Sequence, residues 1–265
     1  MGKLIDLDDE EIVNPIDPQA STQEKIQHLA ALSKDNEPKV LAFLKQIDAK
    51  YGTTSKTSHK EADKIAEKAR RPAITEVKPW HDVEHIRDSF RFKTVLSDLE
   101  DLPRIAEDLK EAGFEVIKTD TDKVLRPGFW GWRIAAFDLR MPNGQLVEYY
   151  LPVQEMEAAK KNGNHELFEK WRNEDVQALT PKQEAEYLDD TDSSKEKYDT
   201  AWRQYLDRTK QKPERVKEIL DNVERVFEKT KPFGTKTISS SALRNQIRER
   251  IREAKLKSKD DELMR

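Results

Sequence analysis

The hydrophobic positions in the first part of the chain repeat at helical spacing. Ser21 and Glu24 form a capping-box pattern, which predicts a short helix that reaches about Leu32. Pro38 predicts the start of a second helix, because proline suits the first turn of a helix. The apolar stripe of this helix consists of Val40, Leu41, Phe43, Leu44 and Ile47. Residues 1–20 are acidic and show no period, so we expect a tail or arm there.

The segment after these helices is more polar. The second helix is expected to end before Gly52, and the polar residues 53–57 are expected to form a loop. Ser58 and Glu61 form another capping-box pattern, and the helix that they predict ends at Arg71. One side of this helix is apolar and consists of Ala62, Ile65, Ala66 and Ala69.

Runs rich in β-branched and aromatic residues predict strands in the middle of the chain. The strands are expected at Ser89–Leu96, Phe114–Lys118, Trp132–Met141 and Gln145–Leu151. A short helix, Trp80–Arg87, is expected before the first strand, and a longer helix, Leu99–Ala112, after it. Asn143-Gly144 predicts that the last two strands form a hairpin. This order of elements predicts an α+β fold in which helices pack on a mixed β-sheet.

The last part of the chain is predicted to be helical. The expected helices are Glu155–Lys161, His165–Arg172, a short helix from Pro181, one around Tyr198–Leu206 and one over Val216–Phe227. Leu243, Ile247 and Ile251 then form a narrow apolar stripe on a basic helix. We therefore expect an N-terminal arm with a short helix (1–36), a core domain (37–175) and a helical C-terminal extension (176–265).

Composition limits the possible function classes. The 265 residues are 35% hydrophobic and 38% charged, which predicts one compact core with long, solvated helices. The net charge of −4 combines both signs and does not indicate nucleic-acid binding. The absence of cysteine excludes disulfides and thiol catalysis. Without a signal-like N-terminus or an apolar run of about 18 residues, we expect a cytoplasmic protein with no membrane partner. A protein delivered into a target cell or carried by a phage would have the same composition.

Two acidic residues lie in or beside apolar strands, where acids are uncommon. They are Asp88 and Glu148, and a buried carboxylate needs a metal ion or a cationic partner. One interpretation is a structural ion pair with Arg91, Lys93 or Arg133. The other is a site for Mg²⁺ and a polyphosphate, which uses carboxylate ligands and surrounding cations. In that case we expect the two carboxylates on neighbouring strands, within reach of one ion.

Basic residues recur along the helix predicted from Ser58. Lys60, Lys64 and Lys68 are four residues apart, and Arg70 and Arg71 follow them. On spacing alone we interpret this as a solvated face with local ion pairs. The alternative is a phosphate-binding face, which would have to turn towards the two carboxylates.

The segment from His81 to His85 fits H-x-x-E-H, the zinc pattern of inverted metalloproteases. Glu84 would be the base in such a site. The pattern is short and the sequence marks no third ligand, so we expect both histidines near a helix start without zinc. His81-Asp82 also resembles the metal motif of HD phosphohydrolases, whose other ligands have no counterpart in this chain.

Five motifs in one order resemble the RelA/SpoT family of (p)ppGpp synthetases. They are the basic helix Lys60–Arg71, the strand Ile86–Thr94 with its Asp, the element Gly131-Trp132-Arg133, the hairpin and strand Asn143–Glu148, and the helical ending Met156–Arg172. The resemblance covers about Glu37–Arg172 and is strongest to small, divergent members found among toxins and phage-borne proteins. It implies a nucleotidyltransferase-like mixed sheet.

The resemblance also implies an activity, a cofactor and partners. The family transfers pyrophosphate from ATP to a ribose 3′-hydroxyl of GDP, GTP, an adenine nucleotide or the 3′ end of tRNA. By resemblance, Mg²⁺ is held by Asp88 and Glu148, which with Arg91 and Lys93 form the catalytic group. The implied ATP-binding residues are Lys60, Lys64, Lys68, Arg70 and Arg71. The implied acceptor-binding residues are Trp132, Arg133, Tyr150, His165 and Arg172.

The chain departs from the family pattern in two strands. The usual Glu-x-Gln is Glu148-Tyr149-Tyr150, and Arg91 and Lys93 replace a small residue and an arginine. These differences motivate an alternative function, a catalytically inactive member of the fold used for binding or assembly, for example in a phage. The C-terminal helices lie outside the resemblance and are the expected contact for a protein partner. Their basic residues between 244 and 259 are either an RNA-binding surface or, as we prefer, the solvated side of a helix docked on Val216–Phe227.

Overall fold

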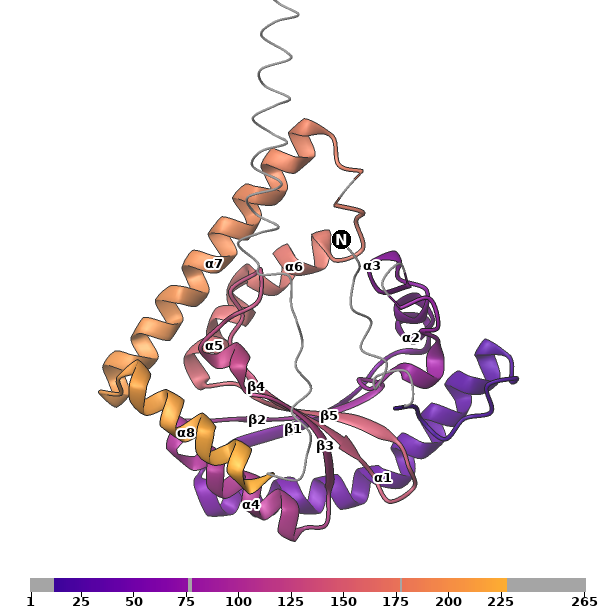
Figure 1. Ribbon diagram of the computed structural model, residues 1–265, viewed down its shortest axis with the longest axis horizontal. Coiled ribbons are helices and arrows are strands. Elements are labelled where there is room, and N and C mark those ends of the chain that lie inside the picture. Colours follow the sequence, from indigo (N-terminus) through magenta and orange to yellow (C-terminus); the bar gives the residue numbers. More distant parts are fainter. Residues whose placement is uncertain (1–11, 76–77, 177, 228–265) are drawn as a thin grey trace, which may run out of the picture.

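The computed structural model describes residues 12–75, 78–176 and 178–227. Within them, five strands form one sheet in the order β1-β2-β5-β4-β3. The strands are β1 (Thr54–His59), β2 (Phe90–Val95), β3 (Glu115–Asp120), β4 (Ala135–Arg140) and β5 (Leu146–Leu151). β2 and β5 are parallel and the other pairs are antiparallel, so the sheet is mixed, as predicted (Figure 1).

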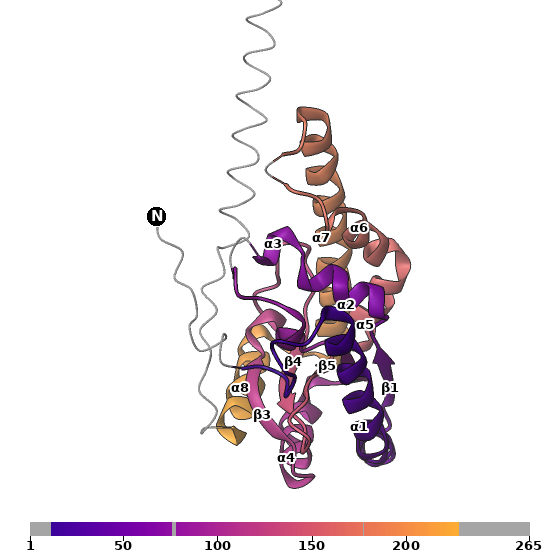
Figure 2. The same ribbon diagram turned by 90° about the vertical axis from the view of Figure 1, so that its right-hand side faces the viewer.

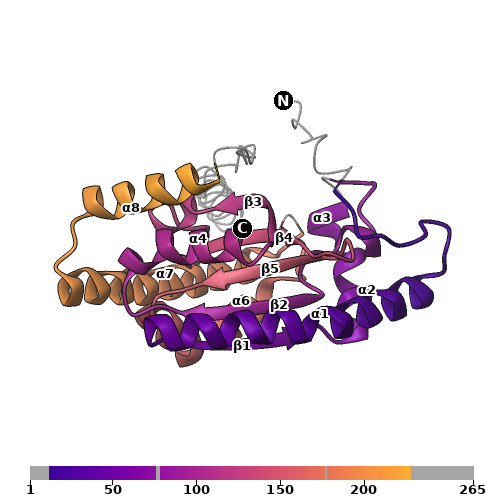
Figure 3. The same cartoon turned by 90° about the horizontal axis from the view of Figure 1, so that it is seen from below.

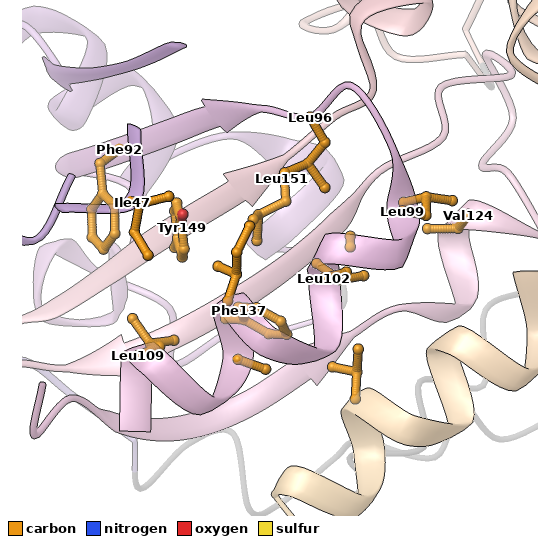
Figure 4. Close-up of a cluster of buried hydrophobic side chains, with 14 of the residues drawn as sticks. Ile47, Phe92, Leu96, Leu99, Leu102, Leu109, Val124, Phe137, Tyr149 and Leu151 are labelled. Carbon is orange, nitrogen blue, oxygen red and sulfur yellow. The ribbon is translucent and has the colours of Figure 1, made fainter. Parts of the chain in front are cut away.

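One face of the sheet carries the main hydrophobic core. Side chains alternate along each strand, so Phe92, Phe137 and Tyr149 lie on the same face and are fully buried. Three helices cover this face: α1 (Thr22–Tyr51), α4 (Leu102–Glu111) and α8 (Pro213–Val226) (Figure 3). Figure 4 shows the aromatic rings of the strands among aliphatic side chains of these helices.

The opposite face is only partly covered. The helix α2 (Ala62–Ala69) lies over one side of it, and α5 (Gln154–Ala159) and α6 (His165–Trp171) lie over the other side (Figure 1). The long helix α7 (Pro181–Thr209) packs against α5 and α6 and extends well past the sheet (Figure 1, Figure 2). The functional residues predicted in β2 and β5 lie on this second face.

Short elements connect the helices and strands. They are α3 (Pro72–Thr75), η2 (Val83–His85), η3 (Leu99–Asp101), η4 (Asp122–Val124) and η5 (Lys160–Asn164). No helix in the described ranges is long and apolar enough to cross a membrane.

The N-terminal helix differs from the prediction. The two expected helices are one continuous α1 that contains Pro38 and ends at Gly52, whose φ of 63° is left-handed. Proline removes one backbone hydrogen bond from a helix. Buried residues on both sides of Pro38, such as Leu29 and Phe43, pack on the body of the protein and hold the helix together. The boundary expected between residues 36 and 37 falls inside this helix.

The segment 53–59 also differs from the prediction. The expected loop and the capping box at Ser58 are wrong, because Thr54–His59 forms β1 and pairs with β2. Its side chains are polar, and polar side chains on an edge strand discourage pairing with the strands of other molecules. The following helix, α2, begins only after Glu61.

Of the short helix expected over Trp80–Arg87, only the 3-10 turn Val83–His85 forms. Most of the other predicted elements lie close to their expected positions. The strands in the middle of the chain, the hairpin at Asn143-Gly144 and the helix before Gly113 are all present. The two helices expected around Pro181 and Tyr198 are joined into α7. The basic helix expected around Leu243–Ile251 lies outside the described residues.

Candidate active site

A row of charged and polar side chains lies on the half-covered face of the sheet. Arg91 on β2 is the register partner of Glu148 on β5, and Glu148 is the partner of Asp138 on β4. Lys93 and Tyr150 form the next row. Because their neighbours in sequence face the hydrophobic core, strand alternation directs all five to the opposite face.

Asp88 lies just before β2 and is 6% exposed. Its Oδ2 lies 2.8 Å from Lys60 Nζ, and its Oδ1 lies 2.8 Å from Lys68 Nζ. Burial disfavours the charged carboxylate, but the positive charges of Lys68 and Lys60 outweigh this and lower the pKa of Asp88 to about 2. Asp88 is therefore a permanent negative charge at neutral pH.

Glu148 behaves in the opposite way. Burial raises the pKa of Glu148 to about 7, and the negative charge of Asp88 adds to this effect. The Tyr150 hydroxyl donates a hydrogen bond to Glu148. The two carboxylates are thus close enough to interact electrostatically, and one is ionised while the other titrates near neutrality.

The lysines predicted to form one face of a helix are divided between two environments. Lys60 precedes α2, and its backbone N–H donates to the Ser89 carbonyl at 2.9 Å. Lys68, in the last turn of α2, reaches Asp88 together with Lys60. Lys64 points elsewhere and lies 2.8 Å from Glu67. Lys60 and Lys68 thus turn towards Asp88, as the phosphate-binding alternative requires, whereas Lys64 forms the local ion pair of a solvated face.

The predicted arginines around α2 have different surroundings. Arg70 is exposed, and Arg71 lies 3.2 Å from Glu67. Arg172, which follows α6, lies 3.4 Å from Glu67 and 2.5 Å from Glu169. Glu67 thus links α2 to the end of α6 across the half-covered face.

Further cations lie along β2 and at the end of α5. Arg91 Nε is buried and has no hydrogen-bond partner within the described residues. Lys93 pairs with Glu157 of α5. Burial lowers the pKa of Lys93 and of Lys160, whose Nζ lies 5.5 Å from the centre of the Trp132 ring. This group can neutralise a polyanion bound over the centre of the sheet.

The residues predicted to bind the acceptor are only partly brought together. Trp132 is half-buried between Lys160 and Tyr198. His165 is exposed, and its Nε2 lies 3.8 Å from Glu169.

Arg133 has partners that favour a structural role. Its guanidinium donates to the backbone carbonyls of Val124 and Leu125, both at 3.0 Å, and to Asp199 of α7 at 3.1 Å. It also lies over the ring of Trp202. These contacts tie α7 to the loop before β4.

Sequence reasoning missed two buried polar residues that hold the segment before Asp88. Asn14 is 1% exposed, although it lies in the segment expected to be a tail. Its side-chain amide donates to the carbonyls of Glu84 and Ile86 at 2.9 and 2.8 Å, and its Oδ1 accepts from the Leu146 N–H at 2.8 Å. It thus connects the residues two positions before Asp88 and two positions before Glu148.

The second missed residue is Lys25 of α1. Its buried Nζ lies 2.6 Å from Asp82 and 2.9 Å from Glu84. A lysine and an asparagine in polar segments carry no periodic signal, so no sequence pattern pointed to them.

The zinc interpretation of the histidine segment has no support in the structure. Among the described residues, no group of three or more His, Asp or Glu side chains is placed to hold a metal ion. His85 ends η2, and its Nδ1 accepts a hydrogen bond from the Asp82 N–H at 3.2 Å. Lys25 takes Glu84 and Asp82 as its ion-pair partners.

Comparisons with known proteins identify the fold. No family model matches the sequence, and no curated protein matches it. The structure is similar to small alarmone synthetase 1 from Bacillus subtilis bound to its product pppGpp, with 16% identity, coverage of 69% of this chain and 91% of that chain, and a TM-score of 0.51. Small alarmone synthetase 2 from the same organism gives 16% identity, 71% and 94% coverage, and a TM-score of 0.48. The chain therefore has the RelA/SpoT synthetase fold that its motifs predict.

Proposed function

We propose that this chain, which has the RelA/SpoT synthetase fold, transfers pyrophosphate from ATP to a ribose 3′-hydroxyl. The observation that carries the proposal is the pair of carboxylates Asp88 and Glu148 on the half-covered face, with Lys60, Lys68 and Arg91 around them. Transfer of a phosphoryl group needs positioning and neutralised charge more than covalent chemistry, and these residues supply both.

The residues present fit a magnesium ion. Mg²⁺ is usually bound by one or two protein carboxylates, and substrate phosphates and water complete its shell. Asp88 and Glu148 would be the two carboxylates. Burial and the negative charge of Asp88 raise the pKa of Glu148 to about 7, so a cation bound between them would favour the ionised form of Glu148. When bound, Mg²⁺ would neutralise negative charge on the phosphates of ATP.

The cations form a row along the half-covered face that could follow a bound triphosphate. Lys60 and Lys68 lie at one end of the row, beside Asp88. Arg91 and Lys93 follow on β2, and Lys160 lies beyond them near Trp132. We infer that these residues hold the donor phosphates, and that the indole of Trp132 stacks on the acceptor base. The roles of Lys64, Arg70, Arg71, His165 and Arg172 stay predictions.

Glu148 is the proposed general base. A base is most effective when its pKa lies near the working pH, and the pKa of Glu148 is about 7. In the reaction, the 3′-oxygen loses its proton to Glu148 and forms a bond to the β-phosphorus of ATP. The bond from that phosphorus to the oxygen bridging it to the α-phosphorus breaks, and AMP leaves. The Tyr150 hydroxyl holds the carboxylate in position during the transfer.

One observation supports the second candidate function, an inactive binding protein. Lys60 and Lys68 already neutralise Asp88 in the chain itself, so the charge that would recruit a metal ion is compensated. A binding role would then use the same half-covered face without catalysis.

The deciding experiment incubates the full chain with γ-labelled ATP, Mg²⁺ and one acceptor at a time. The acceptors are GDP, GTP, AMP, ADP, ATP and tRNA. Label appearing on an acceptor, and its loss in Asp88→Asn, supports the transferase. Transfer to none of them, with the chain folded, favours the binding protein.

A further inference from the structure

One face of α7 runs beside the segment that carries Trp132. The contacting residues of α7 recur at intervals of one and three, so they share one side of the helix. They are Ser194, Lys195, Tyr198, Asp199 and Trp202. Between them they contact every residue from 130 to 133. Because α7 begins at Pro181, it lies outside the stretch that resembles the RelA/SpoT family.

The backbone of this segment is held by a buried serine. Ser194 is fully buried, and its Oγ donates a hydrogen bond to the Trp130 carbonyl at 3.0 Å. The carbonyl of Ser194 in turn accepts from the side-chain amide of Asn164, which is 1% exposed, at 3.3 Å. Asn164 ends η5, the junction between α5 and α6. Ser194 therefore connects the segment before Trp132 with this junction.

Gly131 allows the close approach of α7. Its φ of 86° is left-handed, which favours glycine. A Cβ at this position would lie 2.9 Å from the Cα of Lys195, a backbone atom that can move only with the helix. Gly128, in the same loop, has open space where a Cβ would lie. The segment can therefore contact α7 in this way only with glycine at position 131.

The ring of Trp132 lies between two side chains from different elements. The ring of Tyr198 meets it edge-on, with 5.3 Å between the ring centres and 63° between the planes. Lys160 of η5 places its Nζ 5.5 Å from the centre of the Trp132 ring. The indole is half-buried, so part of it is open to a ligand. An indole that already has one orientation loses little freedom when a flat ring stacks on it.

We propose that Ser194 and Tyr198 are positioning residues, which hold Trp132 in the orientation in which a nucleobase stacks on it. Ser194 holds the backbone before Trp132 and Tyr198 holds its ring, so neither has to touch the acceptor. The stacking of the acceptor base rests on the proposed function, whereas the fixed orientation of the indole does not. The helical extension is then part of the site, through α7.

The orientation of Trp132 is measured by NMR on the full chain without nucleotide. Tryptophan labelled with ¹⁵N gives an indole N–H signal for each tryptophan, and Trp132→Phe identifies the signal of Trp132. A rigid indole has a high ¹⁵N heteronuclear NOE and a mobile one has a low NOE. We expect a high NOE in the parent and a clearly lower one in Gly131→Ala and Tyr198→Leu. The first variant pushes the segment off α7, and the second removes the ring edge but keeps an apolar side chain.

Three control variants keep the contacts of Trp132. Gly128→Ala adds the same methyl group to the same loop, in open space. Tyr205→Leu removes another buried tyrosine of α7, which stacks on Trp202 and not on Trp132. Tyr198→Phe keeps the ring edge and should restore the behaviour of the parent. All three should keep the high NOE. An equal fall in Tyr205→Leu and Tyr198→Leu would show a general loosening of α7 and would overturn the proposal.

The consequence for the reaction is a difference between the two substrates. With the acceptor that takes label in the transfer assay, Gly131→Ala and Tyr198→Leu should raise the acceptor KM about tenfold, because a small misplacement of a binding group is costly. The KM for ATP should stay within a few-fold of the parent. An unchanged acceptor KM, or an equal rise of both KM values, would overturn the positioning role.

Failure of this inference and failure of the proposed function give different results. A chain that labels no acceptor, but whose indole is rigid in the parent and mobile in the two variants, would reject the reaction and retain the role of α7 in holding Trp132. An active chain whose indole has a low NOE in the parent would retain the reaction and overturn the inference.

Discussion

Asn14 and Leu146 are joined by a hydrogen bond of 2.8 Å from the Leu146 N–H to the Asn14 side-chain oxygen. They are 132 residues apart in the chain. Through this bond, and through two bonds from its amide to the segment before Asp88, Asn14 fixes the spacing of the strands that carry the proposed catalytic carboxylates. The N-terminal segment is therefore part of the architecture of the site.

Replacing Asn14 with Ala should lower both stability and activity. The change removes three side-chain hydrogen bonds and leaves buried backbone groups without partners, which we expect to destabilise the fold by about 2–4 kcal/mol. A denaturant unfolding curve measures the loss. Gln19→Ala, on the exposed part of the same segment, is the matched control and should unfold like the parent. An Asn14→Ala unfolding curve that overlays the control curve would show that the three hydrogen bonds of Asn14 do not stabilise the fold.

The lysines near α2 should separate into two classes. Lys68→Ala removes a contact to Asp88 and a proposed phosphate contact, and should reduce the rate of transfer about a hundredfold or more. Lys60→Ala should have an effect of similar size. Lys64→Ala is the control, because its side chain is exposed and pairs with Glu67. Its rate should stay within a few-fold of the parent, and equal losses in all three variants would contradict the geometry.

Glu148→Gln should abolish transfer and stabilise the chain at alkaline pH. The folded-state pKa of Glu148 is about 7 and the ordinary value is 4.5, so its ionisation opposes folding increasingly as the pH rises from 4.5 to 7. The neutral amide does not have this cost, which we estimate at about 1–3 kcal/mol at pH 8. Thermal melts of parent and variant at pH 5 and pH 8 test this, since the difference should be clearly larger at pH 8 than at pH 5. Equal differences at both values would exclude the titration of Glu148 as the cause.

Tyr150→Phe should move the pH dependence of transfer. Burial dominates the pKa of Glu148, and the hydrogen bond from Tyr150 acts against it by lowering that pKa. Without the hydroxyl, the pKa of Glu148 should rise, so the rate should reach its plateau at a higher pH than in the parent. A pH–rate profile of both proteins measures the shift. An unchanged profile with a uniformly lower rate would assign Tyr150 to acceptor binding alone.

Arg133→Ala should weaken the fold more than it changes acceptor binding. It removes hydrogen bonds to two carbonyls and to Asp199, which connect α7 with the loop before β4. We expect a loss of stability of about 1–3 kcal/mol and an acceptor KM within a few-fold of the parent. Steady-state kinetics below the melting temperature provide the comparison. A large rise in KM with normal stability would restore the acceptor role that the sequence suggested.

The sequence by itself determined the elements whose signals are local. The hairpin at Asn143-Gly144 and the helix before Gly113 follow from turn chemistry and apolar period, and the structure has both. It also marked Asp88 and Glu148, because a carboxylate in or beside an apolar strand is unusual enough to be visible without coordinates. At these places the local propensity and the pattern of buried residues agree, so the sequence alone was sufficient to predict them.

Only the tertiary structure decided which side chains meet. The polar β1 is a strand because β2 offers it an edge, and α1 continues through Pro38 because apolar residues on both sides of the proline are buried. Arg133 pairs with Asp199, which is 66 residues away. Asn14 connects Ile86, in the segment before β2, with Leu146 of β5, which are 72 and 132 residues away from it. Hydrogen bonds and ion pairs depend on distances of about 3 Å, and the chain sets such distances between remote residues only when it packs.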